Sequence, residues 1–190
     1  MTNLVKKQSL LKLTPISILL LLLLSMMSLS SSSCSKDDPE PDLVPITMMG
    51  ANTMGFYVDG VPCNIEGKGS WNFPRGVDYF LFSENEIQIS GNLGSDQIIK
   101  FLRIKFKIDS FNPLRKYILK SDILDSGQGL ALDNQSLGGQ EYVTDSTNKG
   151  EINILKFNEK LISGTFQFNA INKESGKIIK INEGRFDINR

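Results

Sequence analysis

Apolar and polar residues alternate with a period of two along most of the chain from Thr47 onward. The clearest stretch is residues 98–109, where every second residue is a large apolar one for most of its length. Its apolar face is made of Leu102, Ile104, Phe106 and Ile108. Because side chains of a strand point to alternate faces, this segment is predicted to be a half-buried β-strand.

The same signal recurs elsewhere in the chain. Residues 161–170 alternate Ile162, Gly164, Phe166 and Phe168 with polar neighbours. Further strands are predicted at residues 54–58, 61–65, 79–82, 86–92, 117–119, 129–132, 140–144, 151–157, 177–182 and 185–188.

Turn residues separate these strands. Asp59-Gly60 between two apolar runs predicts a two-residue hairpin, because a type I′ turn needs positive φ at both central positions. Residues 158–160 and 172–176 are predicted to be later hairpin tips. No segment combines a helix cap with a helical apolar stripe. Residues 47–190 are therefore expected to form a single all-β domain, an antiparallel β-sandwich or a flattened barrel.

The first 33 residues have the three parts of an export signal. Three lysines come first, the apolar run from Ile16 to Leu29 follows, and four serines lead directly to Cys34. The run is shorter than the roughly 20 residues that a spanning helix needs. This ending resembles a lipobox, although Ser31 stands where a leucine is usual. We expect residues 1–33 to be a lipoprotein signal peptide and Cys34 to carry acyl chains; the alternative is an ordinary secretory signal with an incidental cysteine.

The residues after Cys34 indicate a tether and a cellular location. Residues 34–46 contain three prolines and several acidic residues, so we expect an extended, disordered tether. Lys36, Asp37 and Asp38 resemble the surface-export signal of Bacteroidota lipoproteins, which implies an outer-membrane protein facing the extracellular side. An acidic segment that only keeps the domain solvated is the alternative.

Composition narrows the possible functions. The chain has 21 basic and 21 acidic residues, but Lys6, Lys7 and Lys12 precede Cys34, so the mature chain has a net charge of −3. This charge gives no general attraction to nucleic acid, which is not expected as a partner. The chain has no histidine, which excludes Ser-His-Asp and Cys-His catalysis. With Cys34 acylated, Cys63 has no disulfide partner and is expected to be a small buried hydrophobe.

Several segments of the domain carry a family resemblance. The segment 50–60 opens the domain, Ile162-Ser163-Gly164-Thr165-Phe166-Gln167-Phe168 lies near its end, and residues 183–188 close it. Together they are similar to a family of small Bacteroidota lipoproteins whose β-rich domain has no assigned function. Cys63 departs from this pattern, in which an aromatic residue follows the first hairpin. The resemblance implies no catalytic residue.

Trp71, Phe73 and Arg75 lie in a glycine-rich, aromatic loop and are the candidate ligand contacts. An exposed Trp71 would stack on the C–H face of a sugar ring. The alternative is that Trp71 and Phe73 close one end of the barrel or sandwich, since large apolar side chains are more often buried.

Other candidate sites each have a simpler explanation. A carboxylate pair for glycoside hydrolysis would come from Glu84, Glu86, Asp133, Glu141 and Asp145. Calcium ligands would come from Asp122, Asp125, Asp133 and Asn134, but their spacing is not that of an EF-hand and solvated turns explain them. A stripe of Arg103, Lys105 and Lys107 would meet an anion, but an outer strand face with acidic cross-strand partners accounts for it. Ser146 is a weak candidate for O-glycosylation.

We therefore expect a lipid-anchored, non-catalytic binding or accessory module without a cofactor. Its partners would be the membrane, through the acyl chains, and a surface glycan, a peptide or an outer-membrane protein. A structural envelope lipoprotein without a small-molecule ligand is the alternative, followed by a carboxylate-based glycoside hydrolase.

Overall fold

The alternating segments form β-strands in the computed structural model, which describes residues 41–69, 75–94, 97–120, 127–133 and 139–190. All of these residues belong to the second of two units of the chain, Pro39–Arg190. The strands of this unit are β1 (Thr53–Val58), β2 (Val61–Glu66), β3 (Gly76–Leu81), β4 (Glu86–Asn92), β5 (Ile99–Lys107), β6 (Lys116–Leu119), β7 (Gln128–Asp133), β8 (Glu141–Val143), β9 (Gly150–Phe157), β10 (Leu161–Ile171) and β11 (Ile178–Asn189).

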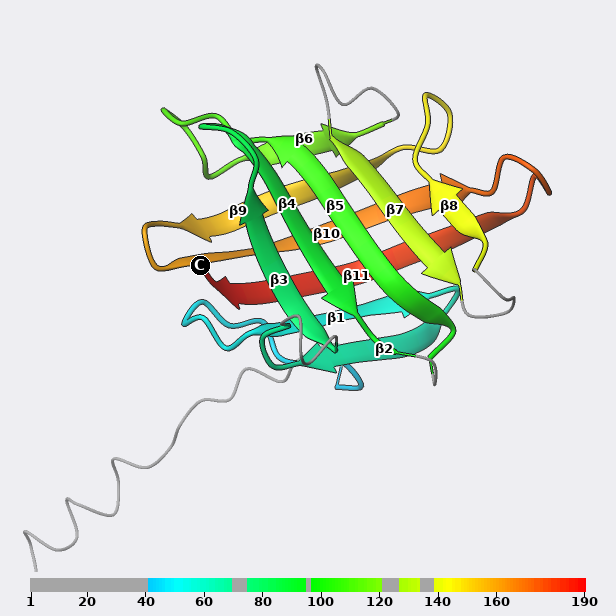
Figure 1. Cartoon of the computed structure of the whole chain (residues 1–190), viewed down its shortest axis with the longest axis horizontal. Helices are drawn as coiled ribbons and strands as arrows, with labels where there is room; N and C mark the ends of the chain where they lie inside the picture. Colours follow the sequence, from blue (N-terminus) through cyan, green and yellow to red (C-terminus); the bar gives the residue numbers. More distant parts are fainter. Residues whose placement is uncertain (1–40, 70–74, 95–96, 121–126, 134–138) are drawn as a thin grey trace, which may run out of the picture. The chain divides into compact units, whose positions relative to one another are not determined.

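The strands form one antiparallel sheet that curls into a nearly closed barrel (Figure 1). Its order is β2-β1-β11-β10-β8-β7-β5-β4-β3, while β9 pairs with β10 and β6 pairs with β9. The two ends of this order meet where Lys68 bridges Val77, so that the chain leaving β2 closes against β3. There the Gly69 N–H donates to the Val77 carbonyl at 3.0 Å, and the Val77 N–H donates to the Gly67 carbonyl at 2.9 Å. Of the two architectures expected from the sequence, the barrel is the one observed.

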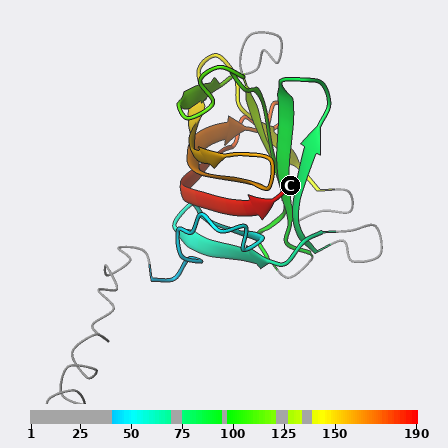
Figure 2. The same cartoon turned by 90° about the vertical axis from the view of Figure 1, so that its left-hand side faces the viewer.

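The core lies between two layers of strands. Strands β3, β4, β5 and β7 cross β9, β10 and β11, and the turned view separates these layers (Figures 1 and 2). On β5 the inward side chains Leu102, Ile104 and Phe106 are at most 1% exposed. On the opposite layer Phe166 packs against Phe56, with ring centroids 5.9 Å apart. Each such side chain contributes about 1.5–3 kcal/mol by leaving water, so burial of this core is the main favourable contribution to folding.

The predicted turns are confirmed. Asp59 and Gly60 have φ values of 50° and 86°, as a type I′ hairpin requires. Asn158 accepts hydrogen bonds from the backbone N–H groups of Lys160 and Leu161 at 2.9 and 3.0 Å, which closes the β9–β10 hairpin. Asn172 plays the same part in the β10–β11 hairpin through Ser175.

One prediction about the strands was wrong. Residues 177–182 and 185–188 do not form separate strands but belong to the single strand β11. The polar break between them is a β-bulge, in which Glu183 has a φ of 51° and the register shifts against both β1 and β10. The next residue of the bulge is Gly184. A larger residue does not fit there, because an added Cβ would lie 2.5 Å from the Phe166 ring.

Residues before residue 47 also pack on the barrel. Leu43 and Val44, placed in the expected tether, are 5% and 7% exposed. The Val44 N–H donates to the Asn64 side chain at 2.8 Å, and Arg185 donates to the Val44 carbonyl at 3.3 Å. Apolar side chains at the end of the acidic segment therefore hold residues 43–44 on the barrel.

The carboxylate of Asp187 fastens the next part of this segment. Asp187 is 1% exposed and lies on β11. It accepts hydrogen bonds from the Thr47 hydroxyl and from the backbone N–H groups of Met49, Gly50 and Ala51, at 2.5–3.1 Å. We call residues 43–51 with Asp187 the N-terminal clasp.

Candidate functional site

A cavity lies where β5 ends, β6 begins and β7 starts. Its volume is about 670 Å³, which is within the range of small-molecule sites. We call it the corner pocket. Its walls are Asn85, Phe106, Lys107, Ile108, Asp109, Ser110, Phe111, Arg115, Lys116, Tyr117, Ile118, Lys120, Gly127 and Lys149.

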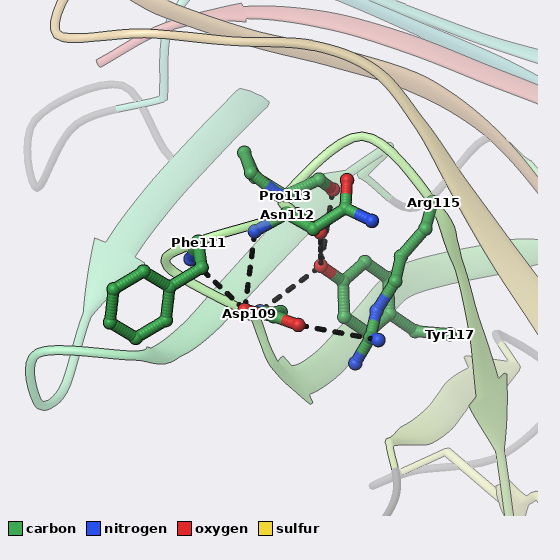
Figure 3. Close-up of polar contacts among 6 residues, drawn as sticks. All are labelled: Asp109, Phe111, Asn112, Pro113, Arg115 and Tyr117. Atoms are coloured by element: carbon green, nitrogen blue, oxygen red, sulfur yellow. Dashed lines mark hydrogen bonds and ion pairs between the residues drawn. The ribbon is translucent and has the colours of Figure 1, made fainter.

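The loop between β5 and β6 is braced by the carboxylate of Asp109 (Figure 3). One carboxylate oxygen accepts hydrogen bonds from the N–H groups of Phe111 and Asn112, at 3.0 and 3.2 Å. The other oxygen lies 3.3 Å from the Arg115 guanidinium. This arrangement is an Asx-turn, in which the side chain accepts hydrogen bonds from the backbone two and three residues later. These bonds replace hydrogen bonds to water and restrict the backbone of the loop.

Tyr117, which lies on β6, anchors the same loop from the side of the core. Its hydroxyl accepts a hydrogen bond from the Asp109 N–H and donates one to the Pro113 carbonyl, both at 3.1 Å (Figure 3). Its ring packs against Phe106 with centroids 5.2 Å apart, and the Arg115 guanidinium lies 5.1 Å from the ring centre. The loop is therefore tied to the core at both ends.

Phe111 stands at the tip of this braced loop. It is fully exposed, with a relative exposure of 101%, and points away from the network that holds its backbone (Figure 3). An exposed phenyl ring on a fixed loop contributes nothing to the core. Its ring can offer apolar surface to a ligand at a small cost in conformational entropy, because hydrogen bonds already hold the loop backbone.

Basic side chains outnumber acidic ones in the described wall of the pocket. Among the described residues, five basic side chains and one acidic side chain, that of Asp109, line it. The basic ones are Lys107, Arg115, Lys116, Lys120 and Lys149. Lys116 lies 2.9 Å from Glu151, and Arg115 pairs with Asp109. The described wall therefore combines charged pairs with further lysine side chains, which can make charge-assisted hydrogen bonds to an acidic or polar ligand.

Two of the three ligand contacts expected from the sequence, Trp71 and Phe73, lie outside the described residues. The expected lipidation site, Cys34, and the expected surface-export signal of Lys36, Asp37 and Asp38 also lie outside them. Arg75 is described; it is exposed and packs beside Gly94. In the part of the chain that the structure covers, no helix has the length and apolar character to cross a membrane.

The candidate carboxylates do not converge on the corner pocket. Asp133 is buried and accepts a hydrogen bond from the Gln140 N–H at 2.8 Å, and Glu86 lies 2.5 Å from Lys105. Asp145 closes a turn, where the Asn148 N–H leads the hydrogen bonds that lower its pKa. Glu84 and Glu141 are exposed.

Of the suggested calcium ligands, Asp122, Asp125 and Asn134 lie outside the described residues. Among the residues that are described, no three His, Cys, Asp or Glu side chains are grouped to hold a metal.

The remaining candidates are explained by their surroundings. Lys105 pairs with Glu86 across β4 and β5, as the cross-strand interpretation of the basic stripe predicts, whereas Lys107 lines the corner pocket. Cys63 is fully buried, and burial raises the pKa of its thiol to about 11, which confirms the small-hydrophobe interpretation. Ser146 is exposed, and its glycosylation stays a prediction.

Sequence reasoning missed the corner pocket itself. Its signal was present in Asp109-Ser-Phe-Asn-Pro113, where turn residues surround a phenylalanine that has no alternating partner. Lys120 and Lys149 are far apart in the sequence, and only the fold brings them to one cavity.

No curated protein and no solved structure matches the chain. A family described as a domain of unknown function, DUF6252, matches residues 81–187, from the end of β3 through most of β11. The match includes the whole corner pocket and agrees with the resemblance to a domain without assigned function. The chain belongs to the DUF6252 family.

Proposed function

We propose that this protein is a non-catalytic binding module whose ligand site is the corner pocket. The observation that carries the proposal is the braced loop that holds a fully exposed Phe111 at the rim of a cavity of about 670 Å³. Binding surfaces of this kind combine a fixed aromatic anchor with a polar rim. The ligand is an extracellular molecule, with a glycan preferred over a peptide or an outer-membrane protein.

The proposal includes the position of the module at the cell surface. It rests on the basic region, the short apolar run and the serines that precede Cys34, and on Lys36-Asp37-Asp38 after it. Acyl chains on Cys34 would hold the chain in the outer membrane, since each buried CH₂ adds about 0.8 kcal/mol. An acidic segment from Lys36 to Asp42 would hold the barrel away from the membrane surface.

The test is a panel of immobilised glycans and peptides, probed with the full chain in a non-ionic detergent. Phe111→Ala should abolish or weaken binding about tenfold or more, as expected for an aromatic anchor. Its unfolding midpoint should stay within experimental error of the parent, because Phe111 makes no core contact.

Phe82→Ala is the matched control. Phe82 is also a largely exposed phenylalanine, with 58% exposure, but it lies between β3 and β4 and does not line the pocket. Equal loss of binding in both variants, or binding that neither variant changes, would overturn the assignment of the site.

A further inference from the structure

We infer that a linear, uncharged polysaccharide binds in the corner pocket and continues from it along the outer face of β9, β10 and β11. The inference rests on the proposed function and adds the shape and the chemical class of the ligand. Three observations carry it: a line of hollows that begins at the pocket, the side chains along that line, and the paired backbone beneath it.

The corner pocket adjoins two further hollows on the outer face of the sheet. The middle hollow, of about 330 Å³, shares Ile118 and Lys149 with the corner pocket. The end hollow, of about 210 Å³, shares Glu151 and Gln167 with the middle one. Because neighbouring hollows share walls, the three form one line, which we call the outer groove. A chain of linked sugar rings fits such a line, whereas a compact molecule would occupy one hollow only.

The outer groove follows strand β10 beyond the corner pocket. Asn169 lines the middle hollow, Gln167 lines both the middle and the end hollow, and Thr165 lines the end hollow. These residues alternate with the buried Phe166 and Phe168 and therefore face outward. Each residue of a strand advances by about 3.3 Å, so the path from Asn169 to Thr165 is about 13 Å long. The outer groove therefore extends well past the corner pocket.

The β-bulge of β11 gives a physical reason for the end hollow. Glu183 and Gly184, the residues of the bulge, both line this hollow. A bulge bends its strand and redirects the side chains near it, and bulges are over-represented next to active sites. The bulge therefore interrupts an otherwise regular sheet face at the point where the groove ends.

Neutral side chains that form hydrogen bonds line the middle and end hollows. These are Asn153, Thr165, Gln167 and Asn169. Amide and hydroxyl side chains both donate and accept hydrogen bonds, as the hydroxyl groups of a sugar do. Apolar surface lies beside them, because Ile118 is 49% exposed next to the corner pocket and Ile46 is 50% exposed in the end hollow. This combination matches a sugar ring, which has apolar C–H faces and a rim of hydroxyl groups.

Charged side chains of both signs favour an uncharged polymer. Lys149 and Lys180 line the middle hollow, whereas Glu183 lines the end hollow and Glu151 lines both. A polymer with the same charge on every ring would meet a like charge in one hollow or the other. An uncharged sugar avoids this repulsion, and its hydroxyl groups can still accept hydrogen bonds from lysine and donate them to a carboxylate.

The paired backbone beneath the outer groove argues against an extended peptide. Strand β10 is hydrogen-bonded to β11 on one side and to β9 on the other along Thr165 to Gln167. Strand β9 is in turn paired with β6. A peptide that binds by adding a strand needs a free strand edge, and β10 has none at these residues.

The experiment measures affinity against chain length by titration calorimetry of the full chain in a non-ionic detergent. The probes are cello-, laminari-, malto- and manno-oligosaccharides, each from the disaccharide to the octasaccharide, with oligogalacturonates as an acidic series. We expect at least one neutral series to bind, with an affinity that rises about tenfold or more with length, equivalent to one or two further hydrogen bonds. The acidic series should bind about tenfold more weakly than the best neutral series, because like charges oppose it.

Two variants locate the contact outside the corner pocket. Gln167→Ala and Asn169→Ala should each weaken the longest oligosaccharide about threefold to tenfold, through the loss of one hydrogen-bonding side chain. The shortest binding member should be unaffected, because a short chain in the corner pocket does not reach these residues. Gln88→Ala is the matched control, because Gln88 faces outward from β4 and lines none of the three hollows.

The outcomes separate this inference from the proposed function. Suppose that oligosaccharides bind without dependence on length, that Gln167→Ala and Asn169→Ala keep the parent affinity, and that Phe111→Ala is disruptive. This result would overturn the outer groove and keep the binding module. An acidic series that binds as tightly as the best neutral one would overturn the uncharged class, and peptide binding without glycan binding would overturn the whole inference; both would keep the module. No ligand in any arm would overturn both proposals.

Discussion

At the scale of single residues, the most consequential side chain outside the pocket is Asp187. Its carboxylate satisfies the Thr47 hydroxyl and three backbone N–H groups in an environment that excludes water. We expect Asp187→Asn to lower the free energy of unfolding by about 1–3 kcal/mol, because the amide replaces an acceptor by a donor that faces those N–H groups. Urea denaturation measures the change.

Glu183→Gln is the control for Asp187→Asn, because it removes a carboxylate from the same strand at an exposed position. An unchanged free energy of unfolding in Asp187→Asn would mean that the N-terminal clasp contributes nothing to stability.

The same residue gives the domain a pH dependence. Burial works against the charge of Asp187, but the hydrogen bonds from Thr47, Ala51, Met49 and Gly50 outweigh it and hold the pKa below its ordinary value. A lowered pKa in the folded state means that the stabilisation is complete above the unfolded pKa of about 3.9 and is lost as the pH falls through the folded pKa. The urea midpoint of the parent should therefore decline below about pH 4 more steeply than that of Asp187→Asn.

At the scale of elements, the β-bulge of β11 depends on Gly184. A Cβ at this position would lie 2.5 Å from the ring of Phe166 and 2.6 Å from its carbonyl oxygen. Gly184→Ala should therefore destabilise the domain by about 1–3 kcal/mol through overpacking. Thermal unfolding followed by circular dichroism reports the change.

Gly176→Ala separates crowding from backbone strain. Gly176 has a φ of 72° but nothing lies within 4 Å of an added Cβ. Gly176→Ala should lower the free energy of unfolding by about 1–2 kcal/mol, because alanine is strained in the left-handed backbone conformation. The variant should keep the aromatic circular-dichroism signal of the parent, because its core is unchanged. A Gly184→Ala protein as stable as the parent would contradict the close contact with Phe166.

Strand positions were predictable because the signal is local. Alternation along β5 and β10 depends only on which residues face the core, and the turns at Asp59 and Asn158 depend on four or five neighbouring residues. The bulge in β11 was not predictable, because it is defined by continued pairing with β1 and β10 on both sides. Ser163 is buried on the face expected to be polar because it lies opposite Asp187, where the N-terminal clasp covers the sheet.

At the scale of the whole molecule, the site is the part that sequence patterns reveal least. The barrel brings residues from three separate parts of the chain to one cavity. Phe111 lies in the β5–β6 loop, Lys120 follows β6, and Lys149 precedes β9. The basic stripe on β5 was visible in the sequence, but only Lys107 lines the pocket while Lys105 pairs with Glu86. Lys107 is the last residue of β5 and lies beside the β5–β6 loop, whereas Lys105 lies within the strand next to Glu86.

The proposed attachment to the membrane gives a prediction for the intact cell. Cys34→Ala should release the protein from the membrane fraction, because the acyl chains are its expected anchor. Replacing Lys36, Asp37 and Asp38 by alanine should keep the protein in the membrane but protect it from protease added to intact cells. Immunoblots of fractionated and protease-treated cells measure both effects. Equal cleavage with and without the three replacements would mean that the acidic segment is only a solvated tether.

The most direct test of the binding site is a map of ligand contacts by two-dimensional NMR. The ¹⁵N-labelled full chain, in a non-ionic detergent, is titrated with an oligosaccharide that the glycan panel identifies. We expect the shifted amides to cluster at Phe111, Ile118 and Lys149, while those of residues 43–51 stay in place. Shifts confined to the clasp or to the loop around Arg75, or spread evenly over the barrel, would contradict the corner pocket as the site of binding.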